Sequence, residues 1–542
     1  MRLTMRRLNK RRPELAVVLG SVSLLAWQMA WSGSPGVILL PLTTLFLCIQ
    51  DNNPSKATSY LWWAIPIIGL GTYLPLTWLI DAKGLFAGLG VVIYATEWLL
   101  TWGVFVFLVK QLRVVGKQRA WLLILMWLSF EMFQSHAEVG FPWLNLGNLF
   151  RDHPRWIQWY AWTGTLGGTV WVLGSSFALS RLVLAPFSKA MNLGIFILLT
   201  VGPWVGSHYL YNHASQVTKP GPGHLYEIGA IQTSSRGPFA GQETLNQLID
   251  SLYHDVSNLP DVIVLPEGSI ERFMRTGSFE WNSLYTKLSG LVARDSNLVV
   301  VSGCNVRHVV KSSDGIHSNG NYTSHKLNAA CLIEKSGAAR FLAKNKFVPF
   351  HEKVPEAFRF IDYPSAHYDY WQTATTSFVP HDSVELVPVI CFESLFGEHC
   401  VQMLSPNPGF YLFLSSEGDL ITPASKQYYL SLARLRAIEG RRYVVRSTNL
   451  GYNAFIDPRG EVIFKSDEYE QTALYTAKVS ASSGLTFYSR HGDWIGRVAL
   501  GALLLFLWMK FTQERLGAGS RSWWRYWSDD CPTPPNSKCA QP

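Results

Sequence analysis

Three apolar segments that we predict as β-strands each lead into a residue type that can do chemistry. DVIVLPEG brings Glu267, AKNKFVPFHE brings Lys344 or Lys346 together with Glu352, and VPVICFE brings Cys391. Side chains from distant parts of a chain converge at strand ends in α/β domains, so these groups are candidates for one site. A cysteine thiolate is a nucleophile, and a nearby ammonium lowers the pKa of the thiol. A carboxylate can take and return the thiol proton while a lysine stabilises an oxyanion, which together predict nucleophilic catalysis.

Other interpretations of the same residues stay open at this level. A cysteine that ends a strand can be buried and inert, a Pro-Glu pair is common in turns, and a lysine near VPF can be solvated. A Cys–His pair is a further possibility, with His351, His381 or His399 as the base. HEKVP begins like a zinc-protease helix but has Pro355 where a second histidine would stand, and no CxxC pair occurs. The sequence therefore indicates no metal site.

Long apolar stretches near both ends of the chain indicate that it crosses a membrane. A helix needs about 20 apolar residues to span a bilayer. We expect eight spans, near residues 15–32, 36–50, 59–80, 88–109, 120–134, 160–183, 192–210 and 495–511. The basic N-terminus and the basic loop 110–119 then lie in the cytoplasm, as the positive-inside rule requires. No small-residue cleavage site follows the first span, so we expect it to be retained.

The 542 residues divide into four predicted parts. These are a membrane domain at 1–211, an outward-facing domain at 212–490, a last transmembrane helix at 491–513 and a disordered cytoplasmic tail at 514–542. Short β-rich runs alternate with amphipathic helices in the second part, which is typical of a layered α/β domain. Most clustered basic residues behind the net charge of +9 flank apolar segments, which argues for membrane topology and against nucleic-acid binding.

Two carboxylates, one aromatic segment and one cysteine pair need separate explanations. Glu97 and Glu131 lie in apolar stretches, where a carboxylate is costly, so each is either functional or paired near an interface. GFPWLNLGNLF at 140–150 is typical of an interfacial or re-entrant segment. Cys304 and Cys331 each lie in a predicted strand and could form a disulfide, which an oxidising compartment permits.

The motifs around the candidate residues resemble those of a known superfamily. PE after an apolar strand, KNKFVPFHE and VICFE are similar to the Glu–Lys–Cys motifs of the nitrilase, or carbon–nitrogen hydrolase, superfamily. Further stretches are GFPWLNLG, LARLRAIEGRRYVVRSTNLGYNAFIDPRGEVI and TFYSRHGDW. With membrane spans on both sides of the domain, nearly the whole chain resembles the apolipoprotein N-acyltransferase family.

The resemblance implies a role for each candidate residue. Cys391 would be the nucleophile, Glu267 the general base and Lys344 the catalytic lysine. Glu352 and Glu393 would be supporting carboxylates. The implied fold is an α-β-β-α sandwich set on a bundle of eight membrane helices, and no cofactor or metal is required.

The implied reaction is a two-step acyl transfer in lipoprotein maturation. An acyl chain would move from a membrane phospholipid, through a cysteine thioester, to the N-terminal amino group of a diacylglyceryl-cysteine apolipoprotein. We expect a monomer in a bacterial inner membrane, with the catalytic domain in the periplasm and both termini in the cytoplasm. Two alternatives stay open: a membrane-tethered amidase or nitrilase on a small C–N substrate, and a non-catalytic homologue that binds lipid or lipoprotein.

The chain departs from the family pattern around the site. SSEGDL at 415–420 stands where the family usually has S-N-D-x-W-F, so the usual Asn and Trp are missing. His351 replaces the glycine of V-P-F-G-E, LPEG replaces W-P-E-[ST], and Leu342 stands where a tyrosine is common. Lys346 would be a bystander. We expect the three reactive residues to be kept while the residues that face the substrates differ.

Overall fold

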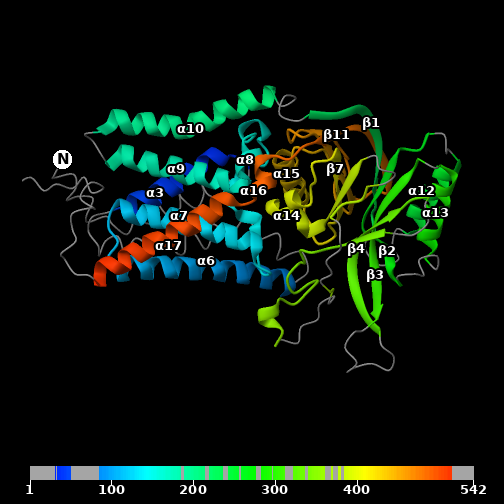
Figure 1. The fold of residues 1–542 in the computed structure, drawn as a ribbon, viewed down its shortest axis with the longest axis horizontal. Helices are drawn as coiled ribbons and strands as arrows, with labels where there is room; N and C mark the ends of the chain where they lie inside the picture. Colours follow the sequence, from blue (N-terminus) through cyan, green and yellow to red (C-terminus); the bar gives the residue numbers. More distant parts are fainter. Residues whose placement is uncertain are drawn as a thin grey trace, which may run out of the picture.

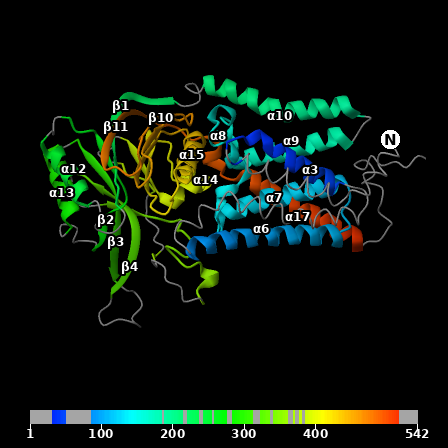
Figure 2. The same cartoon turned by 180° about the vertical axis from the view of Figure 1, so that it is seen from behind.

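The computed structural model shows a bundle of long helices beside a β-rich domain (Figure 1). The structure describes residues 31, 33–50, 85–184, 188–213, 219–235, 242–254, 258–275, 282–295, 297–311, 322–335, 340–360, 368–369, 376–379 and 384–515. The view from behind shows the same arrangement, with the long helices running away from the sheet (Figure 2). The molecule therefore has a helical half and a sandwich half.

The helical half consists of long apolar helices and a connection rich in 3-10 turns. Its elements are η1 (Pro35–Ile38), α3 (Leu39–Ile49), α6 (Leu85–Gln111), α7 (Lys117–His136), η3 (Pro142–Leu144), η4 (Leu146–Phe150), η5 (Pro154–Trp156), α8 (Tyr160–Thr163), α9 (Thr165–Leu184), α10 (Lys189–Asn212) and α17 (Trp494–Arg515). Three helices in the described ranges are long and apolar enough to cross a membrane, namely Thr165–Leu184, Lys189–Asn212 and Trp494–Gln513. The apolar side chains that α10 and α17 leave exposed are the surface that a bilayer would cover.

The expected count of eight spans is not confirmed. The segments 36–50, 88–109 and 120–134 are helical but are not among the three helices above. The α3 helix has 11 residues, which is about 16 Å at the usual rise and short of a hydrocarbon core of roughly 30 Å. The expected span 59–80, nearly all of the span 15–32 and the tail beyond Arg515 lie outside the described residues.

In the described residues, the sandwich half is built on eleven strands joined in one hydrogen-bonded order. They are β1 (Lys219–Gln232), β2 (Val262–Arg275), β3 (Val299–Lys311), β4 (Tyr322–Ile333), β5 (Arg340–Ala343), β6 (Glu385–Ile390), β7 (Gly409–Ser416), β8 (Val444–Asn449), β9 (Ala454–Ile456), β10 (Val462–Lys465) and β11 (Ala473–Ser483). The order is β10-β9-β8-β7-β11-β1-β2-β3-β4-β5, with β6 paired to β7. The pairs β1–β2, β2–β3, β6–β7 and β7–β8 are parallel. Cys304 and Cys331, on neighbouring strands, form the expected disulfide.

Buried side chains alternate between two sides of the same strands, which divides the domain into layers. In β2, Ile263 and Leu265 pack with the helices α12 (Gln242–His254) and α13 (Ser283–Arg294). Val262 and Val264 point the other way, into a cluster shared with β6, β7 and β8. The far side of β6 and β7 packs on α14 (Gly397–Gln402) and α15 (Pro423–Gly440). Because strand side chains alternate with a period of two, these clusters make the expected α-β-β-α sandwich.

The remaining short elements are η9 (Glu356–Phe358), η11 (Cys391–Leu395) and α16 (Phe487–His491). The α15 helix begins where the Thr422 hydroxyl accepts from the Ser425 N–H at 3.1 Å, with Pro423 in its first turn. It ends at Arg441, which has a left-handed φ of +51°. These signals fix the two ends of the helix that faces the helical half.

The segment 140–150 joins the two halves. Trp143 is buried and its ring stacks on Tyr428 and Tyr429 of α15, with centroids 5.5 and 5.4 Å away. The Tyr428 hydroxyl also donates to the Trp143 carbonyl at 2.5 Å. The segment is therefore buried beneath α15, where its aromatic rings contact the sandwich half. Its interfacial or re-entrant position in a membrane stays a prediction.

Glu131 holds this segment in place from α7. Its carboxylate accepts from the Leu146 N–H at 2.8 Å, the Thr169 hydroxyl at 2.5 Å and the Trp127 indole at 3.0 Å. It is fully buried. Glu97, the other carboxylate of the apolar stretches, accepts from the Gln134 amide. Both acids are thus paired by hydrogen bonds, which supports the structural interpretation of the two.

Replacing Glu131 tests whether this network fixes the junction. Glu131→Leu leaves three buried donors without their acceptor, each at a cost of about 1–3 kcal/mol. We expect a clear fall in the midpoint of thermal unfolding in detergent, and a smaller fall for Glu131→Gln, which keeps one acceptor oxygen. Glu468→Leu, at an exposed position, is the control. An unchanged midpoint for Glu131→Leu would contradict the structural role.

Candidate active site

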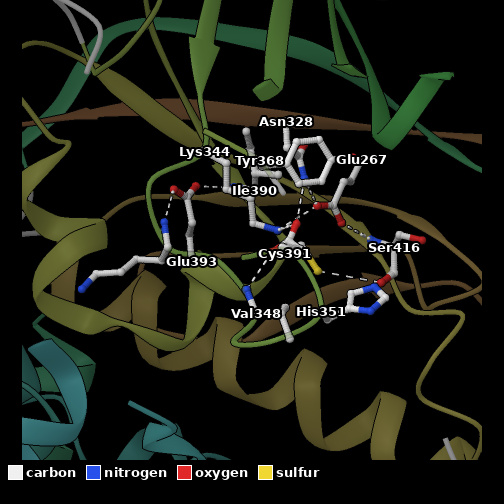
Figure 3. A network of polar contacts seen from close by, with 12 residues as sticks. Glu267, Asn328, Lys344, Val348, His351, Tyr368, Ile390, Cys391, Glu393 and Ser416 are labelled. Atoms are coloured by element: carbon white, nitrogen blue, oxygen red, sulfur yellow. Dashed lines mark hydrogen bonds and ion pairs between the residues drawn. The ribbon is translucent and has the colours of Figure 1, made fainter. Parts of the chain in front are cut away.

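Glu267, Lys344 and Cys391 come from three different strands and meet in one place (Figure 3). Glu267 lies within β2, Lys344 directly follows β5, and Cys391 directly follows β6 as the first residue of η11. The Lys344 N–H still donates to the Asn328 carbonyl of β4 at 2.8 Å, which extends the strand pairing by one residue. The structure therefore brings together the three residues that the sequence singled out.

Irregular backbone at two points directs these side chains. The register of β2 on β3 shifts between Leu265 and Ile270, so Glu267 lies in a break in the ladder. Gly303 of β3 makes this possible, because a Cβ atom there would lie 2.4 Å from the Glu267 Cα atom. Cys391 has a left-handed φ of +48°, an unfavourable conformation for a residue with a side chain. Such strain at a strand end is common at functional sites.

Two carboxylates share Lys344. The Lys344 Nζ atom lies 2.9 Å from Glu267 Oε1 and 2.8 Å from Glu352 Oε1. The Asn328 amide donates to the same two oxygens, at 2.8 and 3.0 Å. Only 1% of the Lys344 side chain is exposed. Because a buried ammonium is costly unless it is paired, the two acids are what allow a charged lysine here.

The electrostatic balance keeps Lys344 protonated. Burial on its own would lower the pKa of the ammonium, but the charges of Glu267 and Glu352 outweigh burial and raise the pKa well above its usual value. The site therefore contains a fixed positive charge across the physiological pH range. Such a charge can stabilise an oxyanion without any change in protonation.

Cys391 lies beside this network as a protonated thiol. Its Sγ atom is 3.8 Å from the Ser416 carbonyl oxygen and 3.8 Å from the Tyr429 hydroxyl. Burial, followed by the charge of Glu267, raises the pKa of the thiol to about 12, although Lys344 acts in the opposite direction. The Ser416 N–H donates to Glu267 Oε2 at 3.2 Å. A nucleophilic attack by this thiol would need a base, and Glu267 is the candidate, because its charge acts on the thiol more strongly than that of Glu352.

Glu393 connects the backbone that follows Lys344 to the backbone that precedes Cys391. Its carboxylate accepts from the Asn345 N–H at 2.6 Å, the Ile390 N–H at 2.8 Å and His399 Nε2 at 3.2 Å. Burial favours a higher pKa for this carboxyl, but the His399 and backbone hydrogen bonds lower the pKa overall. This geometry agrees with a supporting function, which stays a prediction.

A cavity of about 700 Å³ opens above these groups. Glu267, Lys344, Glu352 and Cys391 all line it. The rest of its wall combines polar groups with a few apolar side chains, among them Ser235, Asn305, Val348, His351, Tyr368, Asp419, Leu420, Ile421, Lys426, Asn449 and Tyr469. The volume is large enough for part of an organic substrate to contact the thiol.

Comparison with known proteins places the chain in a family. The family model described as "Apolipoprotein N-acyltransferase N-terminal domain" matches residues 20–178, and the one described as "Carbon-nitrogen hydrolase" matches residues 228–484. A protein of Pseudomonas paraeruginosa named "Apolipoprotein N-acyltransferase" is 28% identical over 70% of this chain and 72% of its own length. Proteins of the same name from Pseudomonas syringae pv. tomato and Vibrio vulnificus are 25% and 24% identical, over 87% and 95% of this chain and 91% and 97% of their own lengths. The chain belongs to the apolipoprotein N-acyltransferase family.

The two matches correspond to the two halves of the structure. The carbon–nitrogen hydrolase match contains Glu267, Lys344, Glu352, Cys391 and Glu393. The N-terminal match covers the helical half from α3 to most of α9, including the segment 140–150. Family membership therefore applies to the site and to the helices that pack beneath it.

The structure also bears on alternatives that the sequence left open. His399 contacts Glu393 and not the thiol, while His381 lies outside the described residues. Lys346 directs its Nζ atom over the Phe396 ring at 4.8 Å, which agrees with its being a bystander. Sequence reasoning missed Asn328 and Tyr429, because neither stands in a motif with the reactive residues.

Glu267→Gln should have opposite effects on ionisation of the thiol and on acyl transfer. The change removes a negative charge that raises the pKa of Cys391, so the pKa falls. Below the pKa, the thiolate fraction increases about tenfold for each unit of lowering. We expect faster alkylation of Cys391 by iodoacetamide at pH 8, measured by mass spectrometry, together with loss of acyl-enzyme formation.

Asp250→Asn removes an exposed carboxylate paired with Lys287 on the outer helices and is the matched control. It should change neither rate. If Glu267→Gln slowed alkylation as strongly as acylation, the effect of the Glu267 charge on the thiol pKa would not control its reactivity.

Proposed function

We propose that this protein is an N-acyltransferase that moves an acyl chain from a membrane phospholipid to the N-terminal amino group of diacylglyceryl-cysteine apolipoproteins. The main support is the buried Lys344, paired with Glu267 and Glu352, next to a strained Cys391 in an open cavity. Homologues over most of the chain bear the name of this activity. The helical half supplies apolar surface for contact with lipid.

In the first step, Cys391 Sγ attacks the ester carbonyl carbon of the phospholipid. Glu267 takes the thiol proton as the S–C bond forms, and the Lys344 ammonium stabilises the oxyanion. The C–O bond then breaks, and Glu267 returns the proton to the oxygen of the departing lysophospholipid. The enzyme keeps the acyl chain as a thioester on Cys391.

In the second step, the acceptor amine attacks the thioester carbonyl carbon. The C–N bond forms, the C–S bond breaks, and Glu267 moves a proton from the nitrogen to the departing sulfur. Both substrates are lipid-anchored, so a site beside the bilayer raises their effective concentration. Water must be kept from the thioester until the amine attacks it.

The same proposal includes the arrangement in the membrane. Residues 1–211 and 491–513 anchor the enzyme in the bacterial inner membrane, and residues 212–490 form the periplasmic catalytic domain. Both termini, including the tail 514–542, are cytoplasmic, and the enzyme acts as a monomer. The basic loop 110–119 on the cytoplasmic side supports this orientation.

Mass spectrometry of the intact, detergent-solubilised protein after incubation with phospholipid tests the proposal. We expect one added acyl mass on Cys391 that hydroxylamine removes, and none on the Cys391→Ala variant. Cys400→Ala is the matched control, because Cys400 is a free, buried cysteine of the neighbouring helix α14. Absence of an adduct on the reduced wild-type enzyme with several phospholipids would contradict the proposed first step.

A further inference from the structure

Two departures from the family pattern meet in space at the cavity. His351 stands in place of the family's glycine, and Asp419 occupies the tryptophan position when SSEGDL is read against S-N-D-x-W-F. The His351 Nε2 atom lies 3.9 Å from Asp419 Oδ2, an ion-pair distance. Both residues line the cavity that contains Cys391. Their side chains are 52% and 46% exposed, so the pair lies where the cavity meets solvent.

The main chain on both sides of His351 is fixed. Phe350 is buried and donates its N–H to the Lys353 carbonyl at 2.8 Å. Glu352 is buried too, and its carboxylate accepts from Lys344 and from the Val348 N–H. Phe350 takes the left-handed conformation, with φ of +62°, and His351 does not. A side chain at 351 is therefore compatible with the turn, and Figure 3 shows it on the Ser416 side of the network.

The main chain on both sides of Asp419 is fixed as well. Glu417, two residues before it, is buried in an ion pair with Arg446, and its N–H donates to the Asn449 carbonyl at 2.8 Å. The Lys426 ammonium donates to the Glu417 carbonyl at 2.8 Å. Leu420, the next residue, donates its N–H to the same carbonyl at 3.0 Å. The altered loop is thus well anchored, and it presents a carboxylate where the family has an aromatic ring.

We propose that His351 and Asp419 form the binding site for the acceptor's α-amino group, and that His351 takes its proton. This rests on the proposed function. At neutral pH an α-amino group is present mainly as an ammonium ion, which cannot attack a carbonyl carbon. Asp419 supplies a negative charge for that ion, and His351 is the one imidazole on the described cavity wall.

The other carboxylates beside the thiol are already committed. Glu267 and Glu352 both accept from the Lys344 ammonium and the Asn328 amide. A second group is therefore needed if the ammonium proton is to be removed before the attack. His351 lines the same cavity as Cys391, so an acceptor amine that reaches the thioester in this cavity also has His351 on its wall.

The protons balance over the transfer step. The neutral imidazole of His351 takes one proton from the ammonium ion, and the amine nitrogen then attacks the thioester carbonyl carbon. As the C–S bond breaks, the second proton passes from the nitrogen through Glu267 to the Cys391 sulfur. The imidazolium of His351 releases its proton to water, and the enzyme returns to its starting state.

A single-turnover experiment isolates this step. The enzyme is loaded with an acyl chain from phospholipid, freed of donor, and mixed with a synthetic diacylglyceryl-cysteine peptide while loss of the acyl-enzyme mass is followed. We expect His351→Ala to load to the wild-type extent but to transfer on the order of 100-fold more slowly, the lower end of what a positioned base contributes. Asp419→Asn should mainly increase the peptide concentration that gives the half-maximal rate.

Comparing hydroxylamine with the peptide distinguishes proton removal by His351 from a purely structural effect of the residue. It is an amine that is largely unprotonated at neutral pH, so its attack on the thioester does not need His351. We expect it to clear the acyl-enzyme of His351→Ala at the wild-type rate. His325→Ala is the matched control, since His325 lies 3.6 Å from Asp369 in another His–Asp pair and does not line the cavity.

The outcomes distinguish the two proposals. A wild-type protein that never forms the acyl-enzyme would overturn the proposed function and this inference with it. An enzyme that loads, and whose His351→Ala variant transfers to the peptide at the wild-type rate, would overturn this inference alone. Equal slowing with peptide and hydroxylamine would also overturn it, because the change would then have disturbed the thioester itself.

Discussion

The site depends on one buried ammonium held between two carboxylates. Lys344 could not keep its charge away from water without Glu267 and Glu352, and these acids in turn accept from Asn328 and from backbone N–H groups such as that of Ser416. The ion network therefore links β2, β4, the end of β5 and the end of β7. It provides both a proton acceptor and a fixed positive charge before any substrate binds, which is the arrangement that stabilises a developing oxyanion.

The helical half contributes to the same site from beneath. Trp143 lies in the segment 140–150, which Glu131 anchors through the Leu146 N–H. Its ring stacks on that of Tyr429, and the Tyr429 hydroxyl lies 3.8 Å from the Cys391 sulfur. The ring centroid of Phe141 lies 6.3 Å from that of Phe392, the residue after Cys391. The thiol is thus positioned by packing between the halves as well as by its own strand. The candidate site therefore lies at the end of the sandwich that packs against the helical half.

The inner and outer parts of the cavity are under different constraints. At the inner end, a change of charge would leave Lys344 or a carboxylate buried without a partner, which is strongly destabilising. At the mouth, His351 and Asp419 are half exposed, so water can hydrate both side chains and the cost of placing polar groups there is small. The family pattern is accordingly kept at the network and altered at the rim.

The sequence by itself determined the strand endings and the types of residue placed there, because alternating apolar runs and short motifs are local signals. It therefore predicted a layered α/β domain and the candidates Glu267, Lys344 or Lys346, and Cys391, while the sandwich and the choice of Lys344 came from the family resemblance. It did not predict Asn328 or Tyr429, the buried position of 140–150, or the contact between the two altered positions. These depend on which strands are neighbours, on their register and on how α15 packs against the helical half. Only the tertiary structure decided them, since such distances follow from packing between segments far apart in the chain.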